Sequence, residues 1–143
     1  MRITCRELLY TDYQRVSAEL YGMYTLAIQE GDMKRARMLA EKQSDIARCF
    51  DMGKYYEASS RLDIAAVEKD RDTVAEIAAE MLSNIEKIDS FKNAPLYEHL
   101  EFKEPEKEFT AVMKENLLNC FRNDETYGFM KDDGRWRELI GKE

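Results

Sequence analysis

The stretch Ala27-Ile-Gln-Glu-Gly-Asp-Met-Lys-Arg-Ala36 decides the fold, because it joins two amphipathic segments through a Gly-Asp turn. Glycine accepts the left-handed backbone that ends many helices, and an aspartate directly after it can cap the next helix. Before the turn, apolar residues recur every three to four positions, at Tyr13, Val16, Leu20, Met23, Tyr24 and Ala27. After it, the same spacing runs through Ala36, Leu39, Ala40, Gln43, Ile46, Ala47 and Phe50. This period predicts two α-helices that form an antiparallel hairpin.

The same period continues through the rest of the chain. A capping box at Thr11 to Gln14 predicts the start of the first helix. A third helix is predicted over about 54–68, and a fourth carries an apolar stripe from Val74 to Ile88. Pro105 is expected to open a fifth helix at its first position, and a short helix with Trp136 follows. No segment alternates with period two, so the chain is predicted to be all-α.

A chain of 143 residues is long enough for one domain and leaves little room for a second. We expect residues 1–143 to form a single helical domain. Within it, helical hairpins are predicted over 11–52 and 53–93, a connector over 94–104, and a C-terminal helix with a cap over 105–143. The hairpins are expected to stack, and a closed five-helix bundle is the alternative.

The two predicted hairpins resemble each other. When residues 17–47 are shifted by 38 positions onto 55–85, the turns align with each other and small residues align with small residues. The identical pairs are Glu19 and Glu57, Ala27 and Ala65, Glu30 and Glu68, Asp32 and Asp70, and Ala40 and Ala78. Consecutive hairpins of similar length are typical of helical repeat arrays.

The stretch from Ala27 to Ala36, followed by Leu39 and Ala40, resembles the turn of a tetratricopeptide (TPR) repeat. That family places small residues where paired helices touch and a Gly-Asp turn between them. The ending over residues 127–140 is similar to the closing turn of TPR-like arrays in bacterial proteins. The repeat here spans 38 residues, whereas the usual one spans about 34. The resemblance implies a right-handed stack of hairpins whose first helices face a concave binding surface.

Carried onto this chain, that layout implies a binding face made by the first helix of each hairpin. The residues that it places there are Tyr21, Thr25, Gln29, Tyr56, Ser59 and Asp63. Tyrosine suits a contact surface because it buries a large area and keeps one polar atom. Tyr13 and Tyr24 lie on the inward stripe and are expected in the core. For Tyr21 and Tyr56, a place in the core and a place on the binding surface remain equal alternatives.

Catalytic motifs are missing from the sequence. His99 is the one histidine, which excludes a metal centre with two or more histidine ligands within one chain. No Walker loop, GxGxxG motif or nucleophile elbow is present. The three cysteines form no CxxC pair, and Cys49 and Cys120 are expected to be buried, inert thiols. We therefore predict that the protein is not an enzyme, and we assign no catalytic, metal or cofactor residues.

Charge and hydropathy limit the partners. Acidic residues outnumber basic ones by 29 to 22, so the chain lacks the positive field from which nucleic-acid binding draws its affinity. No apolar run approaches the ~20 residues of a membrane span. The first residues carry charges where a signal peptide needs apolar side chains, which predicts a cytoplasmic protein.

These observations predict a non-catalytic module that binds a protein or peptide and needs no cofactor. Two alternatives stay open. One is a self-associating, homodimeric helical scaffold, because incomplete repeat stacks bury their open end against a copy of themselves. The other is the ligand-sensing tail of a transcription regulator.

Overall fold

The computed structural model describes residues 5–88, 90–98 and 108–141, with only the backbone helix described for 5–10. Every regular element in these ranges is a helix, which confirms the all-α prediction. The α-helices are α1 (Cys5–Gln29), α2 (Met33–Cys49), α3 (Lys54–Ser59), α4 (Leu62–Val67), α5 (Arg71–Asn84), α6 (Phe109–Phe121), α7 (Asp124–Tyr127) and α8 (Gly134–Leu139). The 3₁₀-helices are η1 (Ile85–Lys87), η2 (Ser90–Asn93), η3 (Pro95–Tyr97) and η4 (Gly128–Met130).

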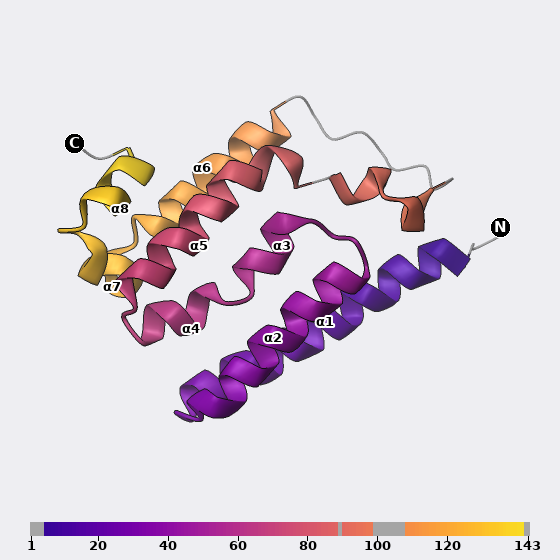
Figure 1. Ribbon diagram of the computed structural model, residues 1–143, viewed down its shortest axis with the longest axis horizontal. Helices are drawn as coiled ribbons and strands as arrows, with labels where there is room; N and C mark the ends of the chain where they lie inside the picture. Colours follow the sequence, from indigo (N-terminus) through magenta and orange to yellow (C-terminus); the bar gives the residue numbers. More distant parts are fainter. Residues whose placement is uncertain (1–4, 89, 99–107, 142–143) are drawn as a thin grey trace.

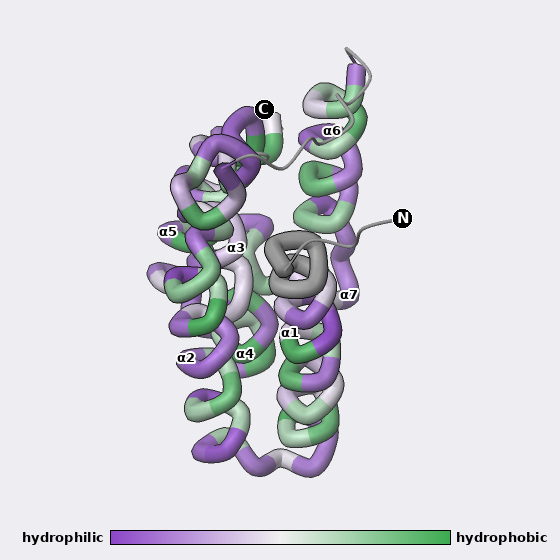
Figure 2. The backbone as a smooth tube through the Cα atoms, turned by 90° about the vertical axis from the view of Figure 1, so that its right-hand side faces the viewer, coloured by the Kyte–Doolittle hydropathy of each residue, from purple (hydrophilic) through white to green (hydrophobic). Residues whose placement is uncertain are grey.

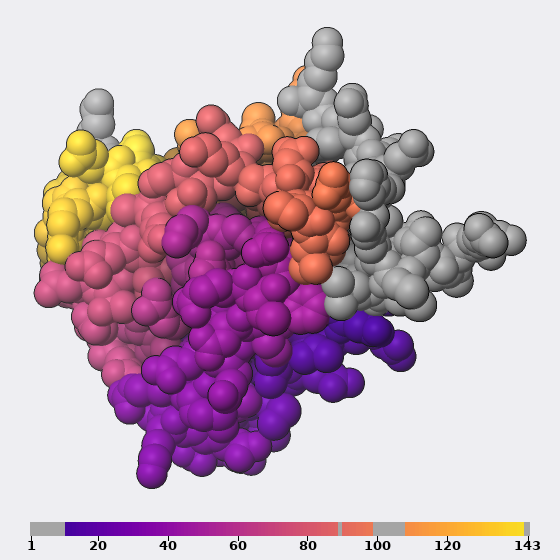
Figure 3. Space-filling view, turned by 45° about the vertical axis from the view of Figure 1, so that its right-hand side comes forward, coloured from indigo at the N-terminus to yellow at the C-terminus, as the bar shows by residue number. Residues whose placement is uncertain are grey.

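The helices are arranged as a hairpin (α1 and α2), a middle layer (α3, α4 and α5) and a C-terminal unit (α6, α7, η4 and α8) (Figure 1). Helices α1 and α2 pack along each other, and α3 and α4 pack between α2 and α5. Figure 2 shows that α1 and α7 lie on one side of α4, whereas α2 and α5 lie on the other. In the space-filling view of Figure 3, the segment around α3–α5 separates the α1–α2 hairpin from the C-terminal unit.

The turn between α1 and α2 forms as the sequence predicts. Gly31 has a φ of 74°, in the left-handed region that glycine favours. The backbone N–H of Asp32 donates to the carbonyl of Ala27 at 2.9 Å, which closes the end of α1. The side chain of Asp32 then accepts a hydrogen bond from the backbone N–H of Arg35 at 3.1 Å and caps α2.

The turn between α4 and α5 has the same chemistry 38 residues later. Lys69 takes the left-handed conformation, with a φ of 56°, without being glycine. The N–H of Asp70 donates to the carbonyl of Ala65 at 3.0 Å. The Asp70 side chain accepts from the N–H of Thr73 at 3.2 Å and caps α5. The shift found in the sequence therefore aligns two turns with matching hydrogen bonds.

The third helix is not continuous, contrary to the prediction of one helix over 54–68. It divides into α3 and α4 at Ser60 and Arg61. The Ser60 hydroxyl donates to the Glu57 carbonyl at 3.1 Å, and the Ser59 hydroxyl donates to the Tyr56 carbonyl at 3.3 Å. Serine side chains that bond nearby carbonyls compete with regular helix hydrogen bonding, which accounts for a break at this pair.

The break leaves new backbone donors at the start of α4, because the first N–H groups of a helix have no partner within it. The N–H of Ile64 is one of them, and it donates to the hydroxyl of Tyr24 on α1 at 2.7 Å. Tyr24 is only 1% exposed, so this hydrogen bond is shielded from water. It joins the first hairpin to the second.

The start and the inward face of α1 differ from the prediction. The helix begins at Cys5, so Thr11 lies inside it and not at its N-terminal cap. Tyr13 and Tyr24 are buried, as expected. Val16 and Met23 are 43% and 41% exposed, although they lie on the predicted stripe. The apolar stripe on α1 is wider than the surface that α2 covers. Helix α2 packs along one flank of α1 and leaves the other flank exposed.

The C-terminal unit closes one end of the core, and Trp136 is its centre. The Trp136 ring lies 5.1 Å from that of Phe121 and 5.3 Å from that of Tyr127, measured between ring centroids. The side chain is 2% exposed and belongs to the same cluster of buried residues as α5. Asp133 caps α8 by accepting hydrogen bonds from the backbone N–H groups of Arg135 and Trp136.

The cysteines, His99 and Pro105 remain to be compared with the sequence expectations. Cys49 and Cys120 are exposed, so the prediction of buried thiols is wrong for both. Each is directly followed in the sequence by a phenylalanine that packs inward, Phe50 or Phe121. His99 and the predicted helix start at Pro105 lie outside the described residues.

We predict that Tyr24→Phe lowers the free energy of unfolding by about 1–3 kcal/mol, because it leaves the Ile64 N–H buried without an acceptor. Tyr55→Phe is the matched control, since the Tyr55 hydroxyl makes no hydrogen bond with the described residues, and it should change stability by less than about 0.5 kcal/mol. Urea denaturation of the three proteins measures both. Equal losses in the two variants would contradict a structural role for the Tyr24 hydroxyl.

Candidate functional site

A groove of about 820 Å³ lies between α1, α4 and the α7–η4 segment. We call it the α1–α4–α7 groove. One wall is α1, the floor is α4 with the turn after it, and the opposite wall is α7 with η4. Its lining residues are Tyr21, Thr25, Ile28, Gln29, Asp63, Ala66, Val67, Lys69, Asp124, Glu125, Thr126, Gly128 and Phe129.

The structure brings together four of the six residues predicted for the binding face. Tyr21, Thr25 and Gln29 line the groove from α1, and Asp63 lines it from α4. Their common place follows from their spacing, because residues four apart lie on one flank of a helix. The two alternatives for Tyr21 resolve toward the surface, since this side chain is 52% exposed.

The other two predicted residues lie in a smaller neighbouring cavity. Tyr56 and Ser59 line a space of about 260 Å³ between α1, α2 and the α3–α4 break. Tyr56 is half-buried and packs against the core, with its ring 6.5 Å from that of Phe91. Tyr21 and Asp63 line this smaller cavity as well as the groove, so they stand at the junction between the two.

Tyr21 and Asp63 are joined by a hydrogen bond. The Tyr21 hydroxyl donates to Oδ2 of Asp63 at 3.2 Å. The negative charge of Asp63 and, to a lesser degree, burial raise the pKa of Tyr21 above its ordinary value, so Tyr21 keeps its proton and remains a donor. The Thr25 hydroxyl donates to the Tyr21 carbonyl at 2.9 Å, so the Thr25 proton is engaged in a hydrogen bond within α1.

Asp63 is a half-buried carboxylate without a cationic partner among the described residues. Its one hydrogen bond in the described part of the chain comes from the neutral Tyr21, and it forms no ion pair there, although Arg61 lies two residues away in the sequence. Burial raises the pKa of Asp63, and the Tyr21 hydrogen bond only partly offsets this effect. An ionised carboxylate in this position costs free energy that a cation in the groove would recover.

The opposite wall was missed by the sequence reasoning, which interpreted residues 105–143 only as a C-terminal helix and a cap. Asp124 and Glu125 begin α7, where Asn123 caps the helix through the N–H of Glu125 at 2.9 Å. Asp124 forms an ion pair with Lys131 at 3.1 Å. The signal in the sequence is the Asn-Asp-Glu helix start, which indicates an N-terminus but not what that terminus faces.

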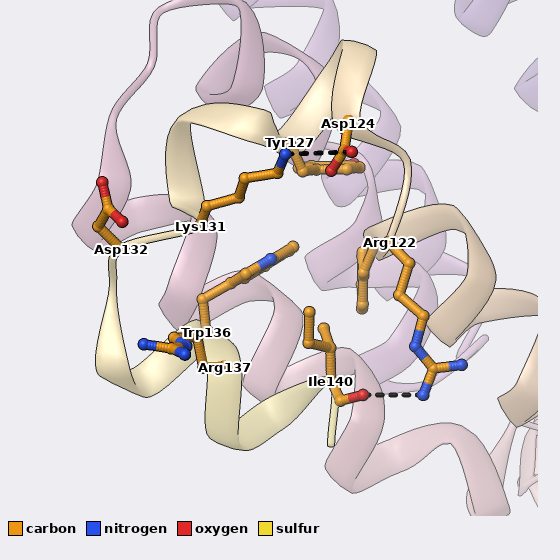
Figure 4. Close-up of a pocket in the computed structure, with 9 residues that line it drawn as sticks. Arg122, Asp124, Tyr127, Lys131, Asp132, Trp136, Arg137 and Ile140 are labelled. Carbon is orange, nitrogen blue, oxygen red and sulfur yellow. Dashed lines mark hydrogen bonds and ion pairs between the residues drawn. The ribbon is translucent and has the colours of Figure 1, made fainter. Parts of the chain in front are cut away.

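A separate cavity of about 280 Å³ lies within the C-terminal unit, around Trp136 (Figure 4). Two of its cationic side chains are held by the protein itself. Arg122 donates to the carbonyl of Ile140 at 2.8 Å, and Lys131 pairs with Asp124. The Arg122 contact fastens the end of α8 to the end of α6, and the Lys131–Asp124 pair joins α7 to the residue after η4, so we assign the cavity a role in closing the fold.

Two kinds of site are missing from the described residues. No three His, Cys, Asp or Glu side chains in this part of the chain gather in a way that could hold a metal ion. None of the helices in the same ranges has both the length and the apolar character to cross a bilayer, and Figure 2 shows hydrophilic residues interspersed along them.

No protein-family model matches the chain, and comparison with curated proteins and with solved structures returns no similar protein. The interpretation of the groove therefore rests on its own geometry.

We predict that Asp63→Asn stabilises the isolated protein relative to wild type at neutral pH. The folded-state pKa of Asp63 is raised, so its ionisation opposes folding; the penalty is absent below the unfolded-state pKa of about 4 and grows as pH rises through the folded-state pKa. The difference in unfolding free energy between the variant and wild type should therefore increase from pH 4 to pH 7 in urea titrations.

Glu125→Gln is the control for this pH series, because Glu125 is an exposed acid on the opposite wall. Its difference from wild type should vary less with pH. If the Asp63→Asn difference stays flat or decreases as pH rises, the Asp63 carboxylate is not penalised by burial.

Proposed function

We propose that this protein is a non-catalytic, TPR-like module of the cytoplasm that binds a segment of polypeptide in the α1–α4–α7 groove. The observation that carries the proposal is the groove itself. Its walls come from a helix near the start of the chain and from a segment near its end, and its lining combines apolar side chains with polar and charged ones. Ligand sites are generally concave and mostly apolar with a few polar groups that fix orientation.

The shared turn chemistry supports the TPR-like part of the proposal. The turns at Asp32 and Asp70 have the same caps and the same helix-closing hydrogen bonds, 38 residues apart. Each begins the second helix of a hairpin, so the first helices, α1 and α3–α4, are equivalent in the repeat. In this layout the binding surface is made by the first helices, and both of them line the groove.

The proposal of binding without catalysis is supported by the chemistry of the groove. A general acid–base site needs a group placed beside the reacting atoms together with a partner that tunes it. In the groove, Asp63 forms a hydrogen bond only with Tyr21 among the residues that the structure describes, and Tyr21 keeps its proton. This pair can hold a ligand by hydrogen bonding and charge, which is what a recognition site requires.

We predict that a displayed random-peptide library, selected on the folded chain, yields peptides that bind wild type and not the Val67→Trp variant. Val67 is 53% exposed on the groove floor, so a tryptophan there fills the groove without disturbing the core. Val112→Trp is the matched control, because Val112 is a helical valine with 54% exposure that lies outside the groove. Fluorescence polarisation measures the affinities.

Peptides that bind all three proteins equally would contradict the proposed site. Circular dichroism and urea denaturation establish that both tryptophan variants keep the fold, so that a loss of binding can be assigned to the groove.

Self-association is a second candidate, and one observation favours it. The flank of α1 turned away from α4 exposes Val16, Met23 and Leu26, and α2 exposes Met38; these side chains are 41–53% exposed. This flank is the open end of the proposed stack, and a second copy would cover it.

If this candidate is correct, sedimentation equilibrium gives a dimer that Met23→Glu converts to a monomer, since a charge would be buried in the interface. Val112→Glu on α6 should leave the dimer intact. A monomer at all concentrations for wild type would eliminate the candidate.

A further inference from the structure

We infer that the polypeptide bound in the α1–α4–α7 groove carries a lysine or arginine, and that Asp63 holds its cationic head between Tyr21 and the α4 floor. This inference rests on the proposed function and deepens it by stating the chemistry of the partner. It begins from the position of Asp63, at the junction of the groove and the smaller cavity.

The first argument is the missing counter-charge. Two other carboxylates that structure this fold have a cationic partner: Asp133 pairs with Arg135 at 2.9 Å, and Glu57 pairs with Arg48 at 3.0 Å. Asp63 is half-buried, yet its only hydrogen bond in the described residues comes from the neutral Tyr21 hydroxyl. Buried charges in proteins are normally paired, so this carboxylate is complementary to a cation supplied from outside.

The second argument is the sign of charge around the groove. Asp63, Asp124 and Glu125 contribute three carboxylates to the lining, against the one cation of Lys69. Asp124 is neutralised by Lys131, which leaves the two carboxylates of Asp63 and Glu125 against the one cation of Lys69, so the lining keeps a net negative charge. An acidic segment would be repelled here, whereas a basic one gains attraction from both carboxylates.

The third argument is the aromatic wall. Tyr21 is half-exposed, and its ring lies next to the carboxylate that its hydroxyl contacts. An ammonium or guanidinium group bonded to Asp63 can therefore also lie against the face of this ring, where a cation–π contact adds to the ion pair. The aliphatic stem of a lysine or arginine would pack on Ala66 and Val67 of the floor.

The fourth argument is the space behind Asp63. The smaller cavity contains Gln43, whose buried Nε2 has no hydrogen-bond partner among the described residues. A half-turn of the amide places the carbonyl oxygen of Gln43 at that position, where it becomes an acceptor. A long cationic side chain that enters past Tyr21 thus meets a carboxylate first and an amide oxygen behind it.

The test uses peptides from the library selection that bind wild type and lose binding in Val67→Trp. We expect lysine or arginine to be enriched at one position of these peptides. Asp63→Asn keeps the size and the acceptor for Tyr21 but removes the charge, and it should weaken binding about 10-fold to 100-fold. Replacing the enriched residue of the peptide by norleucine should weaken binding to wild type by a similar factor.

The two changes form a double-mutant cycle. If the cation contacts Asp63, the norleucine peptide should bind wild type and Asp63→Asn about equally, so the effects are not additive. Glu19→Gln is the control, because Glu19 is an exposed acid on α1 that does not line the groove, so its loss should weaken binding of the basic peptide by no more than about 3-fold.

The outcomes separate the inference from the proposed function. Groove-dependent peptides that lack an enriched basic residue, or that bind Asp63→Asn as tightly as wild type, overturn the inference and leave the proposed function standing. Fully additive effects in the cycle also overturn it. A selection without any peptide sensitive to Val67→Trp contradicts the proposed function, and the inference falls with it.

Discussion

The hydrogen bond from the Ile64 N–H to the Tyr24 hydroxyl is the contact on which the arrangement of the two hairpins depends. It exists because the helix breaks at Ser60 and Arg61 and so presents unpaired backbone donors to α1. Tyr24 fixes Ile64 against α1, and Asp63 is the residue directly before Ile64. Tyr21 lies one helical turn before Tyr24, so the same contact brings Tyr21 and Asp63 together.

A stability cost is therefore built into the groove. The fold places a carboxylate where desolvation opposes its charge, and it supplies only a neutral hydroxyl to compensate. Functional sites commonly carry groups that reduce the stability of the free protein. In this protein the cost and the proposed recognition of a cation come from the same residue, which makes Asp63 informative in both kinds of measurement.

The sequence predicted the parts of the fold that depend on local chemistry. The period of apolar residues identified the helices, and Asp32 and Asp70 marked turns because a capping side chain acts within three residues. It also predicted that Tyr21, Thr25, Gln29 and Asp63 share a surface, through a resemblance that fixes which helices face each other. The broken helix was missed because a pair of serines is compatible with either a continuous helix or a break.

Contacts between residues far apart in the sequence account for the remaining differences between the predicted and the observed structure. Nothing local to Asp124 or Glu125 indicates that α7 lies opposite α1, because that depends on how the C-terminal unit folds back over α5. Val16 and Met23 lie on an apolar stripe of α1, but the stripe alone does not indicate how many neighbouring helices cover it. Cys49 and Cys120 were placed in the core because they adjoin phenylalanines, although adjacent residues of a helix point in different directions.

The position of Trp136 has a spectroscopic consequence. The chain has a single tryptophan, and it lies against Phe121 and Tyr127 within the C-terminal unit. Its emission spectrum therefore senses water only when this unit opens, whereas far-ultraviolet circular dichroism averages over all helices. Coincident melting curves from the two signals would mean that both hairpins and the C-terminal unit unfold as one cooperative body. Separated curves would divide the molecule into units that open independently, with the α1–α4–α7 groove spanning the boundary between them.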